Sequence, residues 1–113
     1  MADRRRSPPP ETPELRRLRR RIDALDRRIV ALLNERARLA REAGQAKTAA
    51  GWTVVRDAER EREILLRVSM ANEGPLPQAD LLAFYRRLFT ATRELEARDR
   101  ARARAGGDGS SDS

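Results

Sequence analysis

The sequence lacks several residue types that enzymes commonly use. Its 113 residues include no cysteine and no histidine, and the aromatic residues are two Phe, one Tyr and one Trp. Without histidine or cysteine there is no imidazole base, no thiol nucleophile and no common zinc site. Any chemistry must therefore depend on Arg, Lys, Asp, Glu and hydroxyl groups, and we expect no bound metal.

Long apolar runs are also missing. No stretch approaches the about 18 apolar residues of a transmembrane helix. The basic residues near the N-terminus are not followed by the apolar stretch of a secretory signal. With no cysteine to form disulfides, the pattern predicts a cytoplasmic protein, and the length predicts one domain.

Positive charge is abundant, and the net charge is +7. Such a balance often indicates nucleic acid or anionic ligands. Nearly all the basic residues are Arg, however, as a GC-rich coding sequence would produce, so we expect no nucleic-acid partner from charge alone. Lys47 is the single lysine. It is either a chance survivor or a position that needs a compact ammonium group.

Three helices and two tails are predicted, which makes the fold all-α. Residues 1–12 join an Arg run to several prolines and are expected to be a disordered tail. Residues 13–104 are expected to hold a long, a short and a long helix, and residues 105–113 a second disordered tail.

The predicted helix boundaries rest on local signals. Thr12 and Pro13 are typical of a helix start, and this first helix should run to about Lys47. Asp57 can cap a second helix ending near Asn72. A third should run from about Gln78 to near Ala103.

The first helix is too long for a protein of this size. A helix of about 35 residues is roughly 50 Å long, whereas the radius of gyration of such a chain is roughly 13 Å. Its apolar residues recur at alternating spacings of three and four, as in a coiled coil. These are Leu15, Leu18, Ile22, Leu25, Ile29, Leu32, Leu39 and Ala43. We therefore predict a homodimer, and a plain structural coiled coil remains an alternative.

Polar residues interrupt the apolar face of each helix. In the first helix Arg36 takes an apolar position, Lys47 lies about three turns further on nearly the same face, and Arg19 lies beside it near the other end. A buried guanidinium is costly unless it is paired or meets an anionic ligand.

The other two helices repeat this anomaly. Asp57 and Glu61 fall on the apolar face of the second helix with Arg60 beside them, and Thr92 and Glu96 extend that of the third. Each alone is more often a structural ion pair. Together they predict one shared internal site, with enough cations to bind a small acid carrying two carboxylates.

The order and spacing of these residues resemble a known family, the all-helical chorismate mutases of the AroQ type. The resemblance covers roughly residues 14–98. It implies an intertwined homodimer with two equivalent sites, each receiving one arginine from the partner, and it implies no cofactor. The matching motifs are Leu15-x-x-Leu18-Arg19-x-x-Ile22-Asp23-x-Leu25-Asp26, Leu32-Leu33-x-Glu35-Arg36, Gly44-x-x-Lys47 and Asp57-x-x-Arg60-Glu61.

The resemblance also implies a role for each matching residue. Arg36 and Arg60 resemble the arginines that bind the substrate carboxylates, and Arg19 resembles the one donated across the dimer. Lys47 matches a lysine that contacts a carboxylate and the ether oxygen of the breaking bond. The last matches are Asp57 and Glu61, near the ring hydroxyl of the substrate, and Thr92 and Glu96, a hydroxyl and its partner one turn later.

A second alignment of the third helix stays open. Matching Phe89 rather than Tyr85 to the aromatic position of the family would move the site to Glu96 and Arg100. Thr92 and Glu96 are preferred because the distance from Glu61 then needs almost no gap.

The implied reaction converts chorismate to prephenate for phenylalanine and tyrosine biosynthesis. Lys47, Glu96 and Arg60 are the expected catalytic residues. Glu96 can donate a hydrogen bond to the ether oxygen only when protonated, so we expect activity to fall as pH rises through its titration. Similar short mutases dock on the first enzyme of the aromatic pathway, and the tails could serve such a contact.

Three alternatives remain open. The nearest is an isochorismate pyruvate-lyase of the same fold, which would use a similar set of cations. The others are a helical dimer that binds nucleic acid, with salt-sensitive affinity, and a purely structural dimer. The last predicts that Arg36→Leu stabilises the protein without loss of function.

Overall fold

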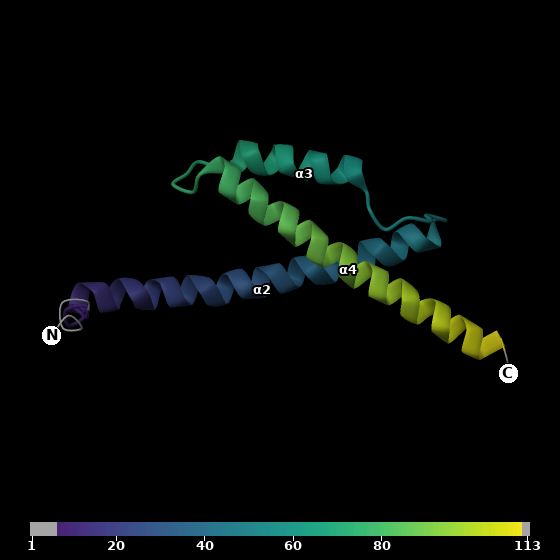
Figure 1. The fold of residues 1–113 in the computed structure, drawn as a ribbon, viewed down its shortest axis with the longest axis horizontal. Helices are drawn as coiled ribbons and strands as arrows, with labels where there is room; N and C mark the ends of the chain where they lie inside the picture. The colour runs from purple at the N-terminus through teal and green to yellow at the C-terminus, as the bar shows by residue number, and fades with distance from the viewer. Residues whose placement is uncertain (1–6, 112–113) are drawn as a thin grey trace. The chain divides into compact units, whose positions relative to one another are not determined.

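The part of the chain that the structure describes forms three helices, as predicted. The computed structural model describes residues 7–111 and contains α2 (Pro13–Ala49), α3 (Ala58–Ala71) and α4 (Gln78–Ser111), with no strand among the described residues (Figure 1). The chain divides into two units, residues 1–36 and 37–113, so α2 belongs to both, and each unit is described by itself. Within the described residues, no helix combines the length and apolar character needed to cross a membrane.

The helix starts follow the predicted capping residues. Thr12 Oγ1 accepts a hydrogen bond of 3.1 Å from the backbone N–H of Leu15, and Asp57 accepts one of 3.0 Å from that of Arg60. Each satisfies an N–H group that has no partner inside the first turn of its helix. At the end of α3, the backbone N–H of Asn72 donates to Val68 O.

The end of α4 differs from the prediction. The helix continues to Ser111, past the end expected near Ala103. The alternating Ala and Arg residues before Gly106 are strong helix formers, and extending an existing helix costs far less than starting one. The disordered tails at 1–12 and 105–113 stay predictions, and residues 1–6 and 112–113 lie outside the described residues.

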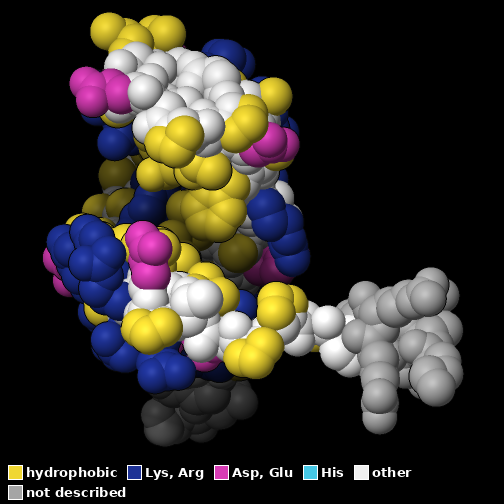
Figure 2. Space-filling view, turned by 90° about the vertical axis from the view of Figure 1, so that its left-hand side faces the viewer, with side chains coloured by type: hydrophobic (Ala, Val, Ile, Leu, Met, Phe, Trp, Pro, Cys, Tyr) yellow, Lys and Arg dark blue, Asp and Glu magenta, His cyan; other side chains and the backbone are white. Residues whose placement is uncertain are grey.

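The first unit is one helical segment with an exposed apolar stripe. In residues 7–36 no side chain is buried. Along the predicted stripe from Leu15 to Leu32, each apolar side chain is between 39% and 58% exposed. Hydrophobic side chains open to solvent, interleaved with basic ones, are also visible on the molecular face in Figure 2. Soluble monomers rarely leave so continuous an apolar surface uncovered.

The second unit holds a small core. Here α3 packs on α4, and α2 beyond Arg36 lies against α4 through side-chain contacts described below. Phe89 is 5% exposed and forms an edge-to-face contact with Tyr85, their ring centroids 6.3 Å apart. Offset and edge-to-face geometry is the favoured arrangement for aromatic pairs.

Candidate active site

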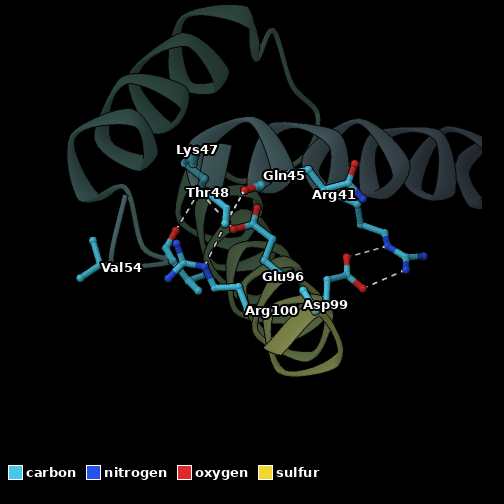
Figure 3. Close-up of a pocket in the computed structure, with 11 residues that line it drawn as sticks. Arg41, Gln45, Lys47, Thr48, Val54, Glu96, Asp99 and Arg100 are labelled. Atoms are coloured by element: carbon cyan, nitrogen blue, oxygen red, sulfur yellow. Dashed lines mark hydrogen bonds and ion pairs between the residues drawn. The ribbon is translucent and has the colours of Figure 1, made fainter. Parts of the chain in front are cut away.

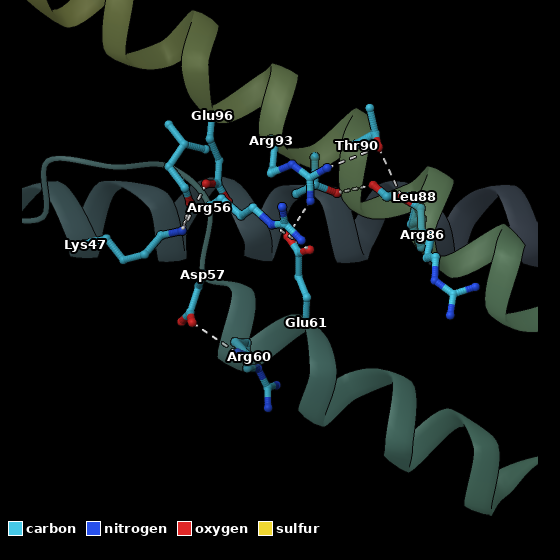
Figure 4. A network of polar contacts seen from close by, with 12 residues as sticks. Lys47, Arg56, Asp57, Arg60, Glu61, Arg86, Leu88, Thr90, Arg93 and Glu96 are labelled. Atoms are coloured by element: carbon cyan, nitrogen blue, oxygen red, sulfur yellow. Dashed lines mark hydrogen bonds and ion pairs between the residues drawn. The ribbon is translucent and has the colours of Figure 1, made fainter.

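The centre of the site is an ion pair between the end of α2 and the middle of α4. Lys47 in the last turn of α2 places Nζ 3.1 Å from Oε2 of Glu96 on α4. The same Nζ donates to the backbone oxygen of Val55 at 2.8 Å and lies 5.7 Å from the ring centroid of Trp52. Figure 4 shows the Lys47 and Glu96 side chains converging from the two helices. The structure therefore brings these two predicted residues into contact, and their roles in a shared substrate site stay predictions.

Gly44 allows Glu96 to lie this close to α2. A Cβ atom at position 44 would stand 2.9 Å from Cγ and 3.1 Å from Cδ of Glu96. Such distances are shorter than normal carbon contacts. Glycine inside a helix costs about 1 kcal/mol relative to alanine. The glycine therefore has a packing reason here, since its missing side chain makes room for the carboxyl group of Glu96, which is only 8% exposed.

A cavity of about 230 Å³ adjoins this ion pair. Lys47, Thr48, Val54, Glu96, Asp99 and Arg100 are among the residues that line it (Figure 3). The walls come from the end of α2, the segment between α2 and α3, and α4. A cavity with a few converging charged groups is the usual form of a small-molecule site.

A second ion pair closes one side of the cavity. Arg41 donates from Nε to Asp99 Oδ2 at 3.0 Å and from Nη2 to Asp99 Oδ1 at 2.9 Å. This is the two-bond geometry that makes arginine–carboxylate pairs specific. The hydrogen bond from Arg41, reinforced by its charge, lowers the pKa of Asp99 below its usual value.

Arg100 joins α4 to the end of α2 and the segment after it. Its Nε donates to Thr48 Oγ1 at 3.2 Å, and its Nη2 donates to the backbone oxygen of Trp52. Arg100 lies one helical turn after Glu96, so both project from the same face of α4. The residue named in the alternative alignment therefore also lines the cavity.

Glu61 lies between two arginines on the α3 side. Its Oε2 is 2.5 Å from Arg93 Nη1, and its Oε1 is 3.4 Å from Arg56 Nε. Arg93 also donates to Thr90 Oγ1 at 3.3 Å. Figure 4 shows this cluster on the same side of α4 as α3. The predicted acidic residue of α3 is thus held by arginines that the sequence analysis had not singled out.

Three further predicted site residues make local contacts. The Asp57 carboxylate caps α3, and Thr92 Oγ1 donates to Leu88 O at 2.8 Å. Arg60 Nη1 is 3.2 Å from Glu63 Oε2, and both side chains are about half exposed. Figure 4 shows the Arg60 side chain directed away from Lys47 and Glu96. Their substrate-binding roles stay predictions.

Two predicted arginines lie in the first unit. Arg19 Nη1 is 3.4 Å from Glu11 Oε1, and the Arg19 side chain is 62% exposed. Arg36 is partly exposed. Their roles in substrate binding stay predictions as well.

The sequence analysis missed Arg41, Asp99, Arg93 and Arg56. One signal was available, because Arg41 precedes Gly44 by three residues and Asp99 follows Glu96 by three. Residues at this spacing lie on one face of a helix. Counting three residues back from Gly44 and three residues on from Glu96 would have identified Arg41 and Asp99 as a candidate pair.

Comparison with known proteins gives a consistent result. Residues 18–97 match the sequence model of the chorismate mutase type II family. The chain is 37% identical over 91 residues to a bifunctional chorismate mutase/prephenate dehydratase of Stutzerimonas stutzeri, which covers 76% of this chain and 25% of that protein. It is 40% identical over 87 residues to a protein of the same name from Aquifex aeolicus, covering 74% of this chain and 24% of the relative. The chain thus spans about a quarter of the length of these curated relatives.

A solved structure of similar size also matches. Form II of chorismate mutase from Thermus thermophilus superimposes with a TM-score of 0.71 at 34% identity, covering 75% of this chain and 96% of that chain. The segment that matches the family model, residues 18–97, includes Lys47, Glu96 and the α3 motif. By family-wide sequence match and by fold, this chain belongs to the type II chorismate mutases.

Proposed function

We propose that this protein is a chorismate mutase that rearranges chorismate to prephenate. The observation that carries the proposal is the Lys47–Glu96 pair beside a cavity, within the segment that matches the family. Lys47 is the single lysine of the chain, and Glu96 is buried. A buried carboxyl group that lies beside a cavity and contacts the single lysine of the chain is a candidate functional group.

The reaction suits a site without histidine or cysteine. One C–O bond breaks and one C–C bond forms inside a single molecule, and no proton or leaving group moves to the enzyme. The protein must hold the folded, reactive conformer and stabilise the negative charge that grows on the ether oxygen. Cations and hydrogen-bond donors are sufficient for both tasks.

Lys47 is proposed to supply the main charge stabilisation. An ammonium group has three N–H donors. The described contacts direct two of them to Glu96 and to the Val55 oxygen. A third is left for an oxygen of the substrate, while the first two keep the ammonium in place. Glu96 would add a second hydrogen bond to the ether oxygen in its protonated form.

The remaining predicted residues are proposed to bind the substrate. Arg36 and Arg60 would grip the carboxylates, and Asp57, Glu61 and Thr92 would lie near the ring. Arg60 would have to leave Glu63 to do so. Exposed ion pairs contribute only about 0–1 kcal/mol, so this rearrangement is inexpensive.

A homodimer is part of the proposal. The exposed stripe from Leu15 to Leu32 supports it, because a second copy would supply an equally long apolar helix. Arg19 would then be donated across the interface into the site of the partner. Docking of the dimer on the first enzyme of the aromatic pathway and a cytoplasmic location stay predictions.

Chorismate consumption by the purified protein tests the activity. The ultraviolet absorbance of chorismate is followed with time, and the product is identified by chromatography. We expect prephenate from the native protein and a loss of about a hundredfold or more in kcat/KM for Lys47→Met and Arg36→Ala, as for removal of one donor to a developing oxyanion. Arg98→Gln, an exposed change on α4, is the control that keeps native activity.

The outcomes separate the alternatives. Absence of turnover by the folded native protein contradicts the proposal. Release of pyruvate from isochorismate, with no prephenate from chorismate, would instead identify a lyase. Native turnover in both Lys47→Met and Arg36→Ala would show that the activity does not depend on the assigned site.

A further inference from the structure

We propose that Arg100 is a positioning residue that ties the segment between α2 and α3 to α4 and so holds Lys47 in its working place. The inference rests on the mutase activity proposed above. It concerns residues 50–57, the connection that passes along one wall of the cavity. Arg100 itself is expected to act through this segment rather than on the substrate.

The connection is anchored by carbonyl groups rather than by buried side chains. None of residues 50–57 is buried, and Trp52 and Val54 are 41% and 59% exposed. The first residues continue from α2, with Gly51 N–H donating to Thr48 O and Trp52 N–H donating to Lys47 O. Beyond them, the Trp52 oxygen accepts from Arg100 and the Val55 oxygen accepts from Lys47.

Two of these contacts hold the Lys47 ammonium group, one from Glu96 and one from the Val55 oxygen. Glu96 and Arg100 are one turn apart on α4 and point to the same side. Glu96 holds the Lys47 ammonium directly, at 3.1 Å. Arg100 holds the connection, which in turn presents the Val55 oxygen to the same ammonium, at 2.8 Å. Lys47 is therefore fixed from two directions, and one of them depends on Arg100.

The guanidinium group is specifically suited to this role. Its Nε and Nη2 donate to two different acceptors, Thr48 Oγ1 and the Trp52 oxygen. The Thr48 hydroxyl donates in turn to Gly44 O at 3.1 Å, which leaves its lone pairs for Arg100. Lysine has no such planar arrangement of separate donors. Figure 3 shows Arg100 beside Thr48 and Glu96 at the cavity.

Loss of Arg100 should affect the chemical step through Lys47. Once the Trp52 oxygen is released, Val55 is no longer held at the ammonium, and only Glu96 orients it. Small displacements of a catalytic group can cost as much as about a hundredfold in rate. We expect Arg100→Gln to lower kcat by about tenfold on this scale, with a smaller change in KM.

Trp52 provides a readout that needs no substrate. It is the single tryptophan of the chain, so fluorescence excited beyond the absorption of Tyr85 reports on the surroundings of Trp52. In Arg100→Gln we expect stronger quenching by acrylamide and emission at longer wavelength than in the native protein, without substrate present. Circular dichroism verifies that the helices remain, and Arg98→Gln is the matched control on the same helix.

Two milder variants sharpen the test. Arg100→Lys keeps the charge but not the two directed donors, so it should behave more like Arg100→Gln than like the native protein. Thr48→Val removes one acceptor and should shift both kcat and Trp52 quenching in the same direction by less. Native behaviour of Arg100→Lys would overturn the proposal, because charge alone would then suffice.

Other results also overturn it. A higher KM with native kcat and native Trp52 quenching would make Arg100 a direct substrate ligand. Native quenching in Arg100→Gln shows that the connection does not depend on this residue. If the native protein has no mutase activity, the proposed function fails, and the fluorescence experiment still decides whether Arg100 holds the connection.

Discussion

The part of α2 before Arg36 and the part after it illustrate two ways of using an amphipathic helix. The first part presents a regular apolar stripe from Leu15 to Leu32, whose side chains are 39% to 58% exposed. The second part carries Arg41, Gly44 and Lys47, each of which meets α4 of the same chain. The first surface stays exposed within its own unit, whereas the second contacts α4.

This difference suggests that the apolar stripe serves the association of chains and that the turns near Lys47 serve the reaction. The stripe from Leu15 to Leu32 is built of apolar residues at regular spacing, whereas the charged residues that line the cavity come from Arg41 onward. The later turns have little apolar surface but several polar contacts at fixed distances. We therefore expect changes in the stripe to affect the association of chains first, and changes near Lys47 to affect the reaction first.

The largest effect is expected from placing a charge in the stripe. Ile29→Glu should dissociate the dimer and lower the free energy of unfolding by about 2 kcal/mol or more, because an apolar side chain at an interface is replaced by a carboxylate. Sedimentation equilibrium and chemical denaturation measure the two changes.

The control for this variant is its neighbour. Val30→Glu changes the next residue, which is similarly exposed but lies off the stripe. It should keep the dimer. Equal dissociation by both variants would show that the stripe does not define the interface.

A large effect on the pH profile is expected at the Lys47–Glu96 pair. A carboxyl group donates a hydrogen bond only in its protonated form, so a donor role for Glu96 predicts that kcat falls as pH rises. Glu96→Gln keeps a donor at every pH, so its profile should be flat while the native profile slopes. A flat native profile would contradict the role of Glu96 as a donor.

An intermediate effect is expected from Gly44→Ala. The added methyl group would meet Cγ of Glu96 at 2.9 Å and push the carboxyl group from Lys47. We expect about a tenfold loss in kcat, consistent with misplacement of a catalytic group. The gain in helix propensity should offset part of the clash in the unfolding free energy.

A matched exposed position checks this interpretation. Ala46→Gly makes the reverse change two residues later, at an exposed side chain outside the predicted apolar stripe. It should lower stability by up to about 1 kcal/mol and leave kcat unchanged. Equal kcat in the native protein and Gly44→Ala would show that the close approach of Glu96 is not needed for catalysis.

The smallest effect is expected at the Arg41–Asp99 pair. Because Arg41 lowers the pKa of Asp99, the pair stabilises the folded protein above the usual titration range of an aspartate. This contribution is lost as pH falls through the lowered pKa. The melting temperatures of the native protein and Asp99→Asn should therefore differ modestly at neutral pH and converge in acid. Glu94→Gln, an exposed change on α4, should show no such convergence.

Much of the fold could be predicted because helix signals are local. Thr12 and Asp57 cap their helices as expected, since a capping side chain contacts N–H groups only a few residues away. The end of α4 at Ser111 was not predicted. The glycines of the C-terminal segment suggested a break, although the preceding Ala and Arg residues favour continued helix.

The site was only partly predictable. Residues that interrupt an apolar face could be recognised by counting along one helix, which identified Lys47 and Glu96. The contacts of Glu61 with Arg93 and of Arg100 with the Trp52 oxygen could not be recognised by such counting, because they join segments far apart in the chain. Arg60 could likewise pair with Glu63 or turn elsewhere, and spacing alone does not choose between them.

By itself, the sequence determined which segments are helical, where they start and which faces are apolar or charged. These properties follow from local hydrogen bonding and from a repeat of about 3.6 residues per turn. Only the tertiary structure decided which charges meet: Lys47 with Glu96, Arg41 with Asp99, and Arg100 with a backbone carbonyl. The physical reason is that side-chain pairing depends on how two helices cross, and that geometry is set by packing between residues distant in sequence.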